Sequence, residues 1–112
     1  MHEEKKDDRL RWVSHNDLKF RIRKFDEDIS VIWVSKQGAD IVFSLMFYDF
    51  LDRCSDNLNI EIDSTWYQWK GFKVKNSDVD FLIGEVISFI EEWGVEAINS
   101  ENRLSEEEWY SL

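Results

Sequence analysis

The stretch from Ser77 to Gly94 carries the clearest hydrophobic pattern in the chain. At about 100° per residue, its apolar residues fall on one half of a helical circumference and its acidic residues fall on the other half. Ser77 and Asp80 have the spacing of a capping box, and Gly94 stands where a left-handed residue ends a helix. The pattern therefore predicts one long amphipathic helix over residues 78–93, with an apolar core face and an anionic outer face.

Alternation of apolar and polar residues predicts strands ahead of this helix. Leu18, Phe20 and Ile22 alternate with basic residues, which is typical of a half-buried strand with a basic outer face. Turn-forming residues separate this strand from its neighbours. The other strands are predicted at residues 10–14, 29–35, 60–63 and 72–75, and the turns at 15–17, 26–28, 36–40 and 70–71.

Three segments remain outside this pattern. Residues 41–48 are apolar on both sides, and we interpret them as a central strand paired with residues 29–35, with a helix as the alternative. Residues 1–9 are charged and do not alternate, which predicts a loose arm. Ser105 and Glu108 repeat the capping-box spacing, which indicates a short C-terminal helix.

Together these elements predict an α+β fold. A run of strands with one long helix is typical of an antiparallel sheet, here of about five strands, with the helix over 78–93 packed on one face. A short C-terminal helix completes the fold. Because 112 residues are enough for one core and too few for two, residues 1–112 are expected to form a single domain.

Composition adds a surplus of aromatic residues. With 43% hydrophobic residues the chain is not a disordered one, although a net charge of −10 alone would suggest disorder. Six Trp, three Tyr and eight Phe exceed what a core of this size needs, so some rings are expected at the surface. Exposed Trp and Tyr are common anchors of protein interfaces.

Charge is distributed unevenly along the chain. Residues 1–25 hold eight basic and five acidic residues, whereas residues 76–112 hold one basic and ten acidic residues. This asymmetry indicates either a solvated face or an electrostatic docking surface. Because an acidic surface is repelled by phosphate and by anionic lipid, neither nucleic acid nor a membrane is expected as the direct partner.

The sequence also predicts a cytoplasmic protein. Cys54 is the only cysteine, so it cannot form an internal disulfide, and the N-terminal residues lack the apolar stretch of a signal peptide. No window is apolar over about 18 residues, so no membrane span is expected.

No residue constellation indicates a reaction. The two histidines and Cys54 lack the spacing of a zinc site. Asp78, Asp80 and Glu85 could hold a divalent ion, but acids at the start of a helix also stabilise its positive end, and we favour that role. Because the chain has no nucleophile elbow and no glycine-rich phosphate loop, we expect no enzymatic activity, no metal and no cofactor.

Trp66, Tyr67 and Trp69 form an aromatic group beside several lysines. Such a group could stack the bases of a single-stranded nucleic acid. In a strand, however, Trp66 and Tyr67 face opposite sides, which places at least one of them in the core. We therefore prefer a protein partner.

The remaining features favour a small acidic module that binds a basic protein. Carboxylates steer a cationic partner, and a few aromatic anchors hold it. Phe81 and Gly84 break the helical pattern by lying on the charged side, where an exposed Phe81 would suit an interface and the alternative is a ring under a neighbouring loop. The predicted partner-binding residues are Asp78, Phe81, Glu85, Ser88, Glu92, Glu106, Glu107, Glu108 and Trp109.

The segment WYQWKGFKVKNSDVDFLIGEVISFIEEWG, residues 66–94, together with the size and acidity of the chain, resembles the bacterial immunity proteins of contact-dependent inhibition and related polymorphic toxin systems. The resemblance implies a cytoplasmic antitoxin that binds one cognate toxin domain, with a nuclease as the expected toxin. A nuclease cleft must be cationic for its substrate, so an anionic protein can cover it. The alternatives are a phage-type DNA mimic that inhibits a defence enzyme, and an adaptor domain whose acidity serves solubility.

Overall fold

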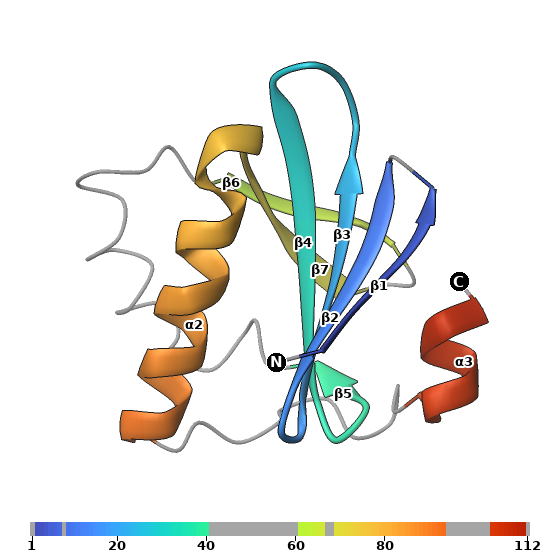
Figure 1. Cartoon of the computed structure of the whole chain (residues 1–112), viewed down its shortest axis with the longest axis vertical. Helices are drawn as coiled ribbons and strands as arrows, with labels where there is room; N and C mark the ends of the chain where they lie inside the picture. Colours follow the sequence, from blue (N-terminus) through green and yellow to red (C-terminus); the bar gives the residue numbers. More distant parts are fainter. Residues whose placement is uncertain (1, 8, 41–60, 67–68, 94–103, 112) are drawn as a thin grey trace.

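A computed structural model of the chain describes residues 2–7, 9–40, 61–66, 69–93 and 104–111 (Figure 1). Within these residues the strands form one antiparallel sheet of seven strands in the order β1-β2-β3-β4-β7-β6, with the short β5 paired to β4. The strands are β1 (His2–Asp7), β2 (Leu10–His15), β3 (Leu18–Lys24), β4 (Ile29–Lys36), β5 (Ala39–Asp40), β6 (Glu61–Trp66) and β7 (Trp69–Lys75). A 3-10 turn η1 (Asn76–Asp78) leads into the long helix α2 (Val79–Trp93), and α3 (Glu106–Ser111) is a short second helix.

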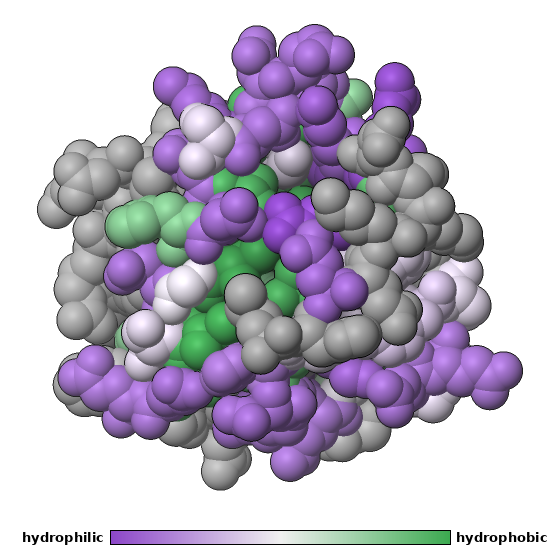
Figure 2. Space-filling model, viewed as in Figure 1, coloured by the Kyte–Doolittle hydropathy of each residue, from purple (hydrophilic) through white to green (hydrophobic). Residues whose placement is uncertain are grey.

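The sheet separates the two helices, with α2 on one face and α3 on the other (Figure 1). In the same view, Figure 2 shows apolar side chains in green in the middle of the molecule, between α2 and the strands, with hydrophilic side chains around them. Each fully buried apolar side chain of this kind contributes about 1.5–3 kcal/mol. The main core combines α2 with Val13, Leu18, Phe20, Ile22, Ile32, Val34, Phe72 and Val74 of the sheet. A smaller second core, on the α3 side, contains Trp12, Val31, Trp33, Leu104 and Trp109.

Tight turns set the register of the consecutive strands. Gln37 and Gly38 join β4 to β5 with φ angles of 54° and 85°, and a two-residue hairpin turn of type I′ requires positive φ at both positions. Asn16, in the turn between β2 and β3, has φ 54°, a conformation that Asn tolerates. The N–H of Gln37 donates to the carbonyl of Asp17 at 3.0 Å, so the two turns support each other. The turns predicted at 15–17 and 36–40 are thereby confirmed at residues 16–17 and 37–38, whereas Ala39–Asp40 belong to β5.

The long helix is confirmed, but it begins through a 3-10 turn instead of the predicted capping box. Ser77 lies inside η1, whose N-cap residue is Lys75 and makes no side-chain capping hydrogen bond. Asn76 holds this entry: its backbone N–H donates to the carbonyl of Asp28 at 2.7 Å. Its side-chain amide donates to two further carbonyls of the β3–β4 turn at 2.9 and 3.1 Å. The start of α2 is therefore fixed to a turn distant in sequence.

The α+β class and the antiparallel sheet with α2 on one face are confirmed, whereas three details differ. The loose arm predicted at residues 1–9 is wrong for residues 2–7, because β1 pairs with β2, and its charged residues suit an edge strand. With β1 and β5, the described sheet has seven strands instead of about five. The turn predicted at 70–71 is wrong, since both residues lie inside β7. The prediction for residues 41–48 lies outside the described residues.

Candidate functional site

The outward face of α2 is acidic and carries a large exposed ring. The helix holds four acidic residues and no basic residue. Phe81 is 55% exposed, Ser88 and Glu92 are exposed, and Asp78 and Glu85 are half-buried. These five predicted residues follow one another three or four positions apart, so they lie along one side of the helix. The opposite side packs into the main core through Val79, Leu82, Ile83, Val86, Phe89 and Ile90.

Gly84 lies on the exposed side of α2, one turn after Phe81, and has no packing role. A methyl group added at Gly84 would meet no heavy atom within 4 Å. Glycine inside a helix costs about 1 kcal/mol relative to alanine, because it loses more backbone freedom on folding. Within the described residues, no neighbour requires glycine at this position. Phe81 and Gly84 are therefore adjacent departures from the amphipathic pattern that packing among the described residues does not explain.

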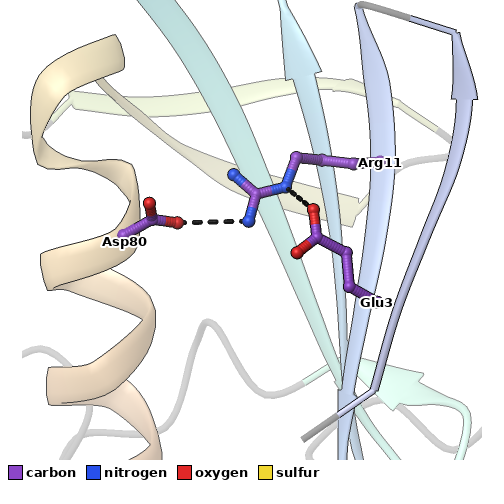
Figure 3. Close-up of polar contacts among 3 residues, drawn as sticks. All are labelled: Glu3, Arg11 and Asp80. Atoms are coloured by element: carbon purple, nitrogen blue, oxygen red, sulfur yellow. Dashed lines mark hydrogen bonds and ion pairs between the residues drawn. The ribbon is translucent and has the colours of Figure 1, made fainter.

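Side chains of the sheet contact acids on one flank of α2, and Figure 3 shows the ion pair that Arg11 forms there. The guanidinium of Arg11 lies between β1 and α2, with Nε 2.7 Å from Oε1 of Glu3 in β1 and Nη2 3.1 Å from Oδ1 of Asp80 in α2. Further along the helix, Nε2 of His15 lies 2.7 Å from Oε1 of Glu91. Because these groups are partly exposed, each pair is worth no more than about 1 kcal/mol. The pairs orient α2 against the sheet.

The acids on the outward side of α2 lack the ion pairs that the described acids on its flank form. Within the described residues, Asp78, Glu85 and Glu92 form no ion pair. Asp80, which the sequence grouped with Asp78 and Glu85 as a potential metal site, is directed to Arg11 instead. Among the described residues, the outward side is therefore a stripe of negative charge around Phe81 that no described cation neutralises.

A second acidic group adjoins the start of α2. Asp26, Glu27 and Asp28 form the turn between β3 and β4, and all three are exposed. Together with Asn76 and its neighbours they line an open hollow of about 660 Å³. The backbone N–H groups of Asp28 and Ile29 donate to the Asp26 carboxylate, each at 2.8 Å, and these bonds lower the pKa of Asp26. Lys75 also lines this hollow, so the acids of the turn adjoin the start of α2 beside a basic side chain.

Sequence reasoning missed the contribution of the β3–β4 turn. The run of three acids was visible, but it was interpreted only as a turn. Its position beside α2 depends on the pairing of β4 with β7, where Ile29 lies opposite Lys75. That pairing joins residues far apart in the chain, and local periodicity carries no signal for it.

The predicted acidic residues of α3 do not join the surface on α2. Helix α3 lies on the opposite face of the sheet, where Glu106–Glu108 are exposed (Figure 1). Oε1 of Glu106 lies 3.2 Å from Nζ of Lys19, so part of this charge is neutralised by β3. Trp109 is 1% exposed, and its prediction as a partner-binding residue is wrong. Its indole fills the second core, because the aromatic side chains on this face of the sheet need an apolar cover.

The basic outer face predicted for β3 is partly wrong. Arg21 is only 6% exposed and stands in register between Trp12 and Trp33 on the neighbouring strands. Its guanidinium carbon lies 5.1 Å from the centre of the Trp33 ring, a cation–π geometry. Burial, and then the nearby charge of Arg23, lower the pKa of Arg21 to about 10, so this group remains protonated at neutral pH.

Among the residues whose side chains the structure describes, few aromatic rings lie at the surface. Three tryptophans whose side chains the structure describes, Trp12, Trp33 and Trp109, are all buried. Among the described residues, the exposed large hydrophobic side chains are Phe25, at 38%, and Phe81. Phe81 is therefore the most exposed ring in the part of the chain that the structure describes.

The described residues contain neither a metal-binding group nor a membrane-spanning helix. Over the described ranges, no group of three or more His, Cys, Asp or Glu side chains could hold a metal ion. In the same ranges, no helix is long and apolar enough to cross a bilayer.

Comparison with known proteins gives no match: no family model fits the chain, and neither the curated proteins nor the solved structures contain a similar one. Function must therefore be inferred from the geometry and charge of this chain.

Proposed function

We propose that this protein is a non-enzymatic immunity protein that binds and neutralises a cognate basic toxin domain, with a nuclease as the expected toxin. The observation that carries the proposal is the outward side of α2, where the exposed ring of Phe81 stands among carboxylates and the helix has no basic residue. The toxin contacts this side of α2, with the acids of the β3–β4 turn next to it.

Charge and apolar surface have separate roles in this contact. The carboxylates raise the rate of encounter with a cationic partner. The Phe81 ring then provides apolar burial, and truncation of a central aromatic anchor of this kind costs about 2 kcal/mol or more. A nuclease must keep a cationic cleft to bind phosphate, so an anionic cover uses a property that the enzyme cannot lose.

The surface is formed before the partner arrives. The core side of α2 is buried against four strands, and Arg11 and His15 pair with its flank. A preorganised surface loses less conformational entropy on binding than a mobile one. The free protein is therefore already shaped for the toxin.

The test is protection of a sensitive host. The product of the adjacent reading frame should be toxic when expressed alone and harmless when this protein is present. The variant Glu85→Lys/Glu92→Lys should lose protection, because it replaces negative charge with positive charge on the docking side. The control Glu61→Lys/Glu107→Lys makes the same charge change at two exposed acids away from α2 and should protect like the wild type.

Two results would contradict the proposal. Full protection by the Glu85→Lys/Glu92→Lys variant, at wild-type abundance, would remove α2 from the toxin contact. Inhibition of several unrelated DNA-cleaving enzymes, in place of one cognate toxin, would favour the DNA mimic.

A further inference from the structure

We infer that the partner covers α2 with a basic amphipathic helix, whose side chains pack into a depression at Gly84 beside the ring of Phe81. This inference rests on the proposed function and specifies the shape and chemistry of the partner at the same surface.

The depression follows from small side chains next to a large one. Phe81 is 55% exposed, and a Cβ at Gly84 would meet open space. Ser88, one turn beyond Gly84, is also small and exposed. Residues three and four apart are neighbours on a helix surface, so Phe81 stands at one end of a low stretch formed by Gly84 and Ser88. A ridge of side chains from a second helix fits such a groove.

Hydrogen bonding favours a helix over a strand or a loop as the cover. The backbone N–H and C=O groups in the middle of α2 are used within the helix, so its surface offers side chains alone. A strand or loop laid across it would bury backbone groups of its own without partners, which costs about 1–3 kcal/mol for each group. A helix satisfies its backbone internally and can cover this side without that loss.

Charge selects a basic helix and disfavours a second copy of this chain. Glu85 and Glu92 border the low stretch, and α2 carries no cation of its own. If α2 of a second copy lay here, it would bring the same acids, and the two surfaces would repel each other. A helix with an apolar stripe bordered by Lys and Arg supplies the opposite charge and a socket for Phe81.

The inference is tested with synthetic peptides, so it does not depend on identifying the natural toxin. The probe is an amphipathic Lys/Leu peptide of about 18 residues, long enough to form a helix against a surface. The control peptide has the same net charge and a central proline, which breaks the helix. Affinity for each peptide is measured by fluorescence anisotropy at low salt, with the wild-type protein and with Gly84→Leu.

Gly84→Leu fills the depression without changing charge. The variant should fold, because the added side chain meets open space and leucine is a better helix former than glycine. We expect the wild type to bind the helical peptide more tightly than the proline peptide. We also expect Gly84→Leu to weaken the helical complex by about tenfold, since the helix can no longer approach closely, and to leave the proline peptide unaffected.

The inference is overturned if the helical peptide does not bind the wild type, if both peptides bind it equally, or if Gly84→Leu leaves the helical complex unchanged. These failures differ from a failure of the proposed function. That proposal is contradicted instead when Glu85→Lys/Glu92→Lys, at wild-type abundance, still protects the host from the toxin.

Discussion

At the residue scale, two glycines differ in whether buried neighbours leave room for a side chain. At Gly71 in β7, an added Cβ would lie 2.7 Å from Cγ1 of Val31 and 3.0 Å from Nε1 of Trp33. Glycine at this position makes room for two buried neighbours from β4. At Gly84 an added Cβ would meet nothing, so no neighbour in the described structure requires the absence of a side chain.

Alanine substitution at these glycines should therefore have opposite effects on stability. We expect Gly71→Ala to lower the free energy of unfolding by about 1–3 kcal/mol, because Val31 and Trp33 must shift to relieve the overlap. Gly84→Ala should raise the free energy of unfolding by up to about 1 kcal/mol, through helix propensity. Urea unfolding of both variants measures the two changes. Changes of the same sign would contradict this account of the glycines.

Single residues also mark the limit of what the sequence could predict about the site. The outward position of Phe81 followed from helical phase, whereas the sequence left open whether its ring is exposed, and the structure shows that it is. The burial of Trp109 did not follow from any local pattern, because its neighbours Trp12 and Trp33 belong to strands far away in the chain. Helical phase is a local property, whereas the second core depends on which strands share a face.

At the element scale, prediction succeeded where the structure is set by neighbours in sequence. The hairpins from β2 to β4 follow from periodicity and turn residues, α2 follows from its helical period, and α3 follows from its capping box. β1 was missed because its residues are charged on both sides, and an edge strand needs only backbone pairing. The 3-10 entry to α2 was missed because its partners lie in the β3–β4 turn.

The start of α3 offers a direct test of a local element. The backbone N–H of Glu108 donates to Oγ of Ser105 at 3.2 Å, and the backbone N–H of Ser105 donates to Oε1 of Glu108 at the same distance. This reciprocal pair is the capping box predicted from the sequence. We expect Ser105→Ala to lower the free energy of unfolding by about 0.5–2 kcal/mol, since the cap is lost. Thermal and urea unfolding measure this change.

Ser111→Ala is the matched control for this substitution. Ser111 is exposed at the other end of α3, where its hydroxyl donates to the carbonyl of Glu108. Loss of this exposed bond should cost less than loss of the cap. Equal destabilisation by the two variants would mean that the capping box does not stabilise α3.

At the scale of the whole molecule, the basic N-terminal segment contacts the acidic helices α2 and α3. Three cationic or titratable groups of the basic N-terminal segment, Arg11, His15 and Lys19, pair with acids of α2 and α3. Part of the excess negative charge is therefore used inside the fold. The acids on the outward side of α2, which pair with no described cation, are the ones that the proposed partner would meet.

The distribution of acids over both faces of the sheet also changes the predicted site. The sequence grouped the acids of α2 with those of α3, yet the sheet lies between these helices (Figure 1). A single rigid partner at α2 leaves α3 on the far side. Charge counted along a chain indicates the sign of a surface, while its location depends on topology.

The central claim is that the outward side of α2 receives a basic partner, and association kinetics with the toxin domain test it most directly. Stopped-flow association is measured at low and high salt for the wild type, Glu85→Lys/Glu92→Lys and the control Glu61→Lys/Glu107→Lys. We predict that the α2 variant associates at least about tenfold more slowly at low salt, that this difference shrinks at high salt, and that the control resembles the wild type. Equal association rates for the wild type and the α2 variant at low salt would contradict the claim.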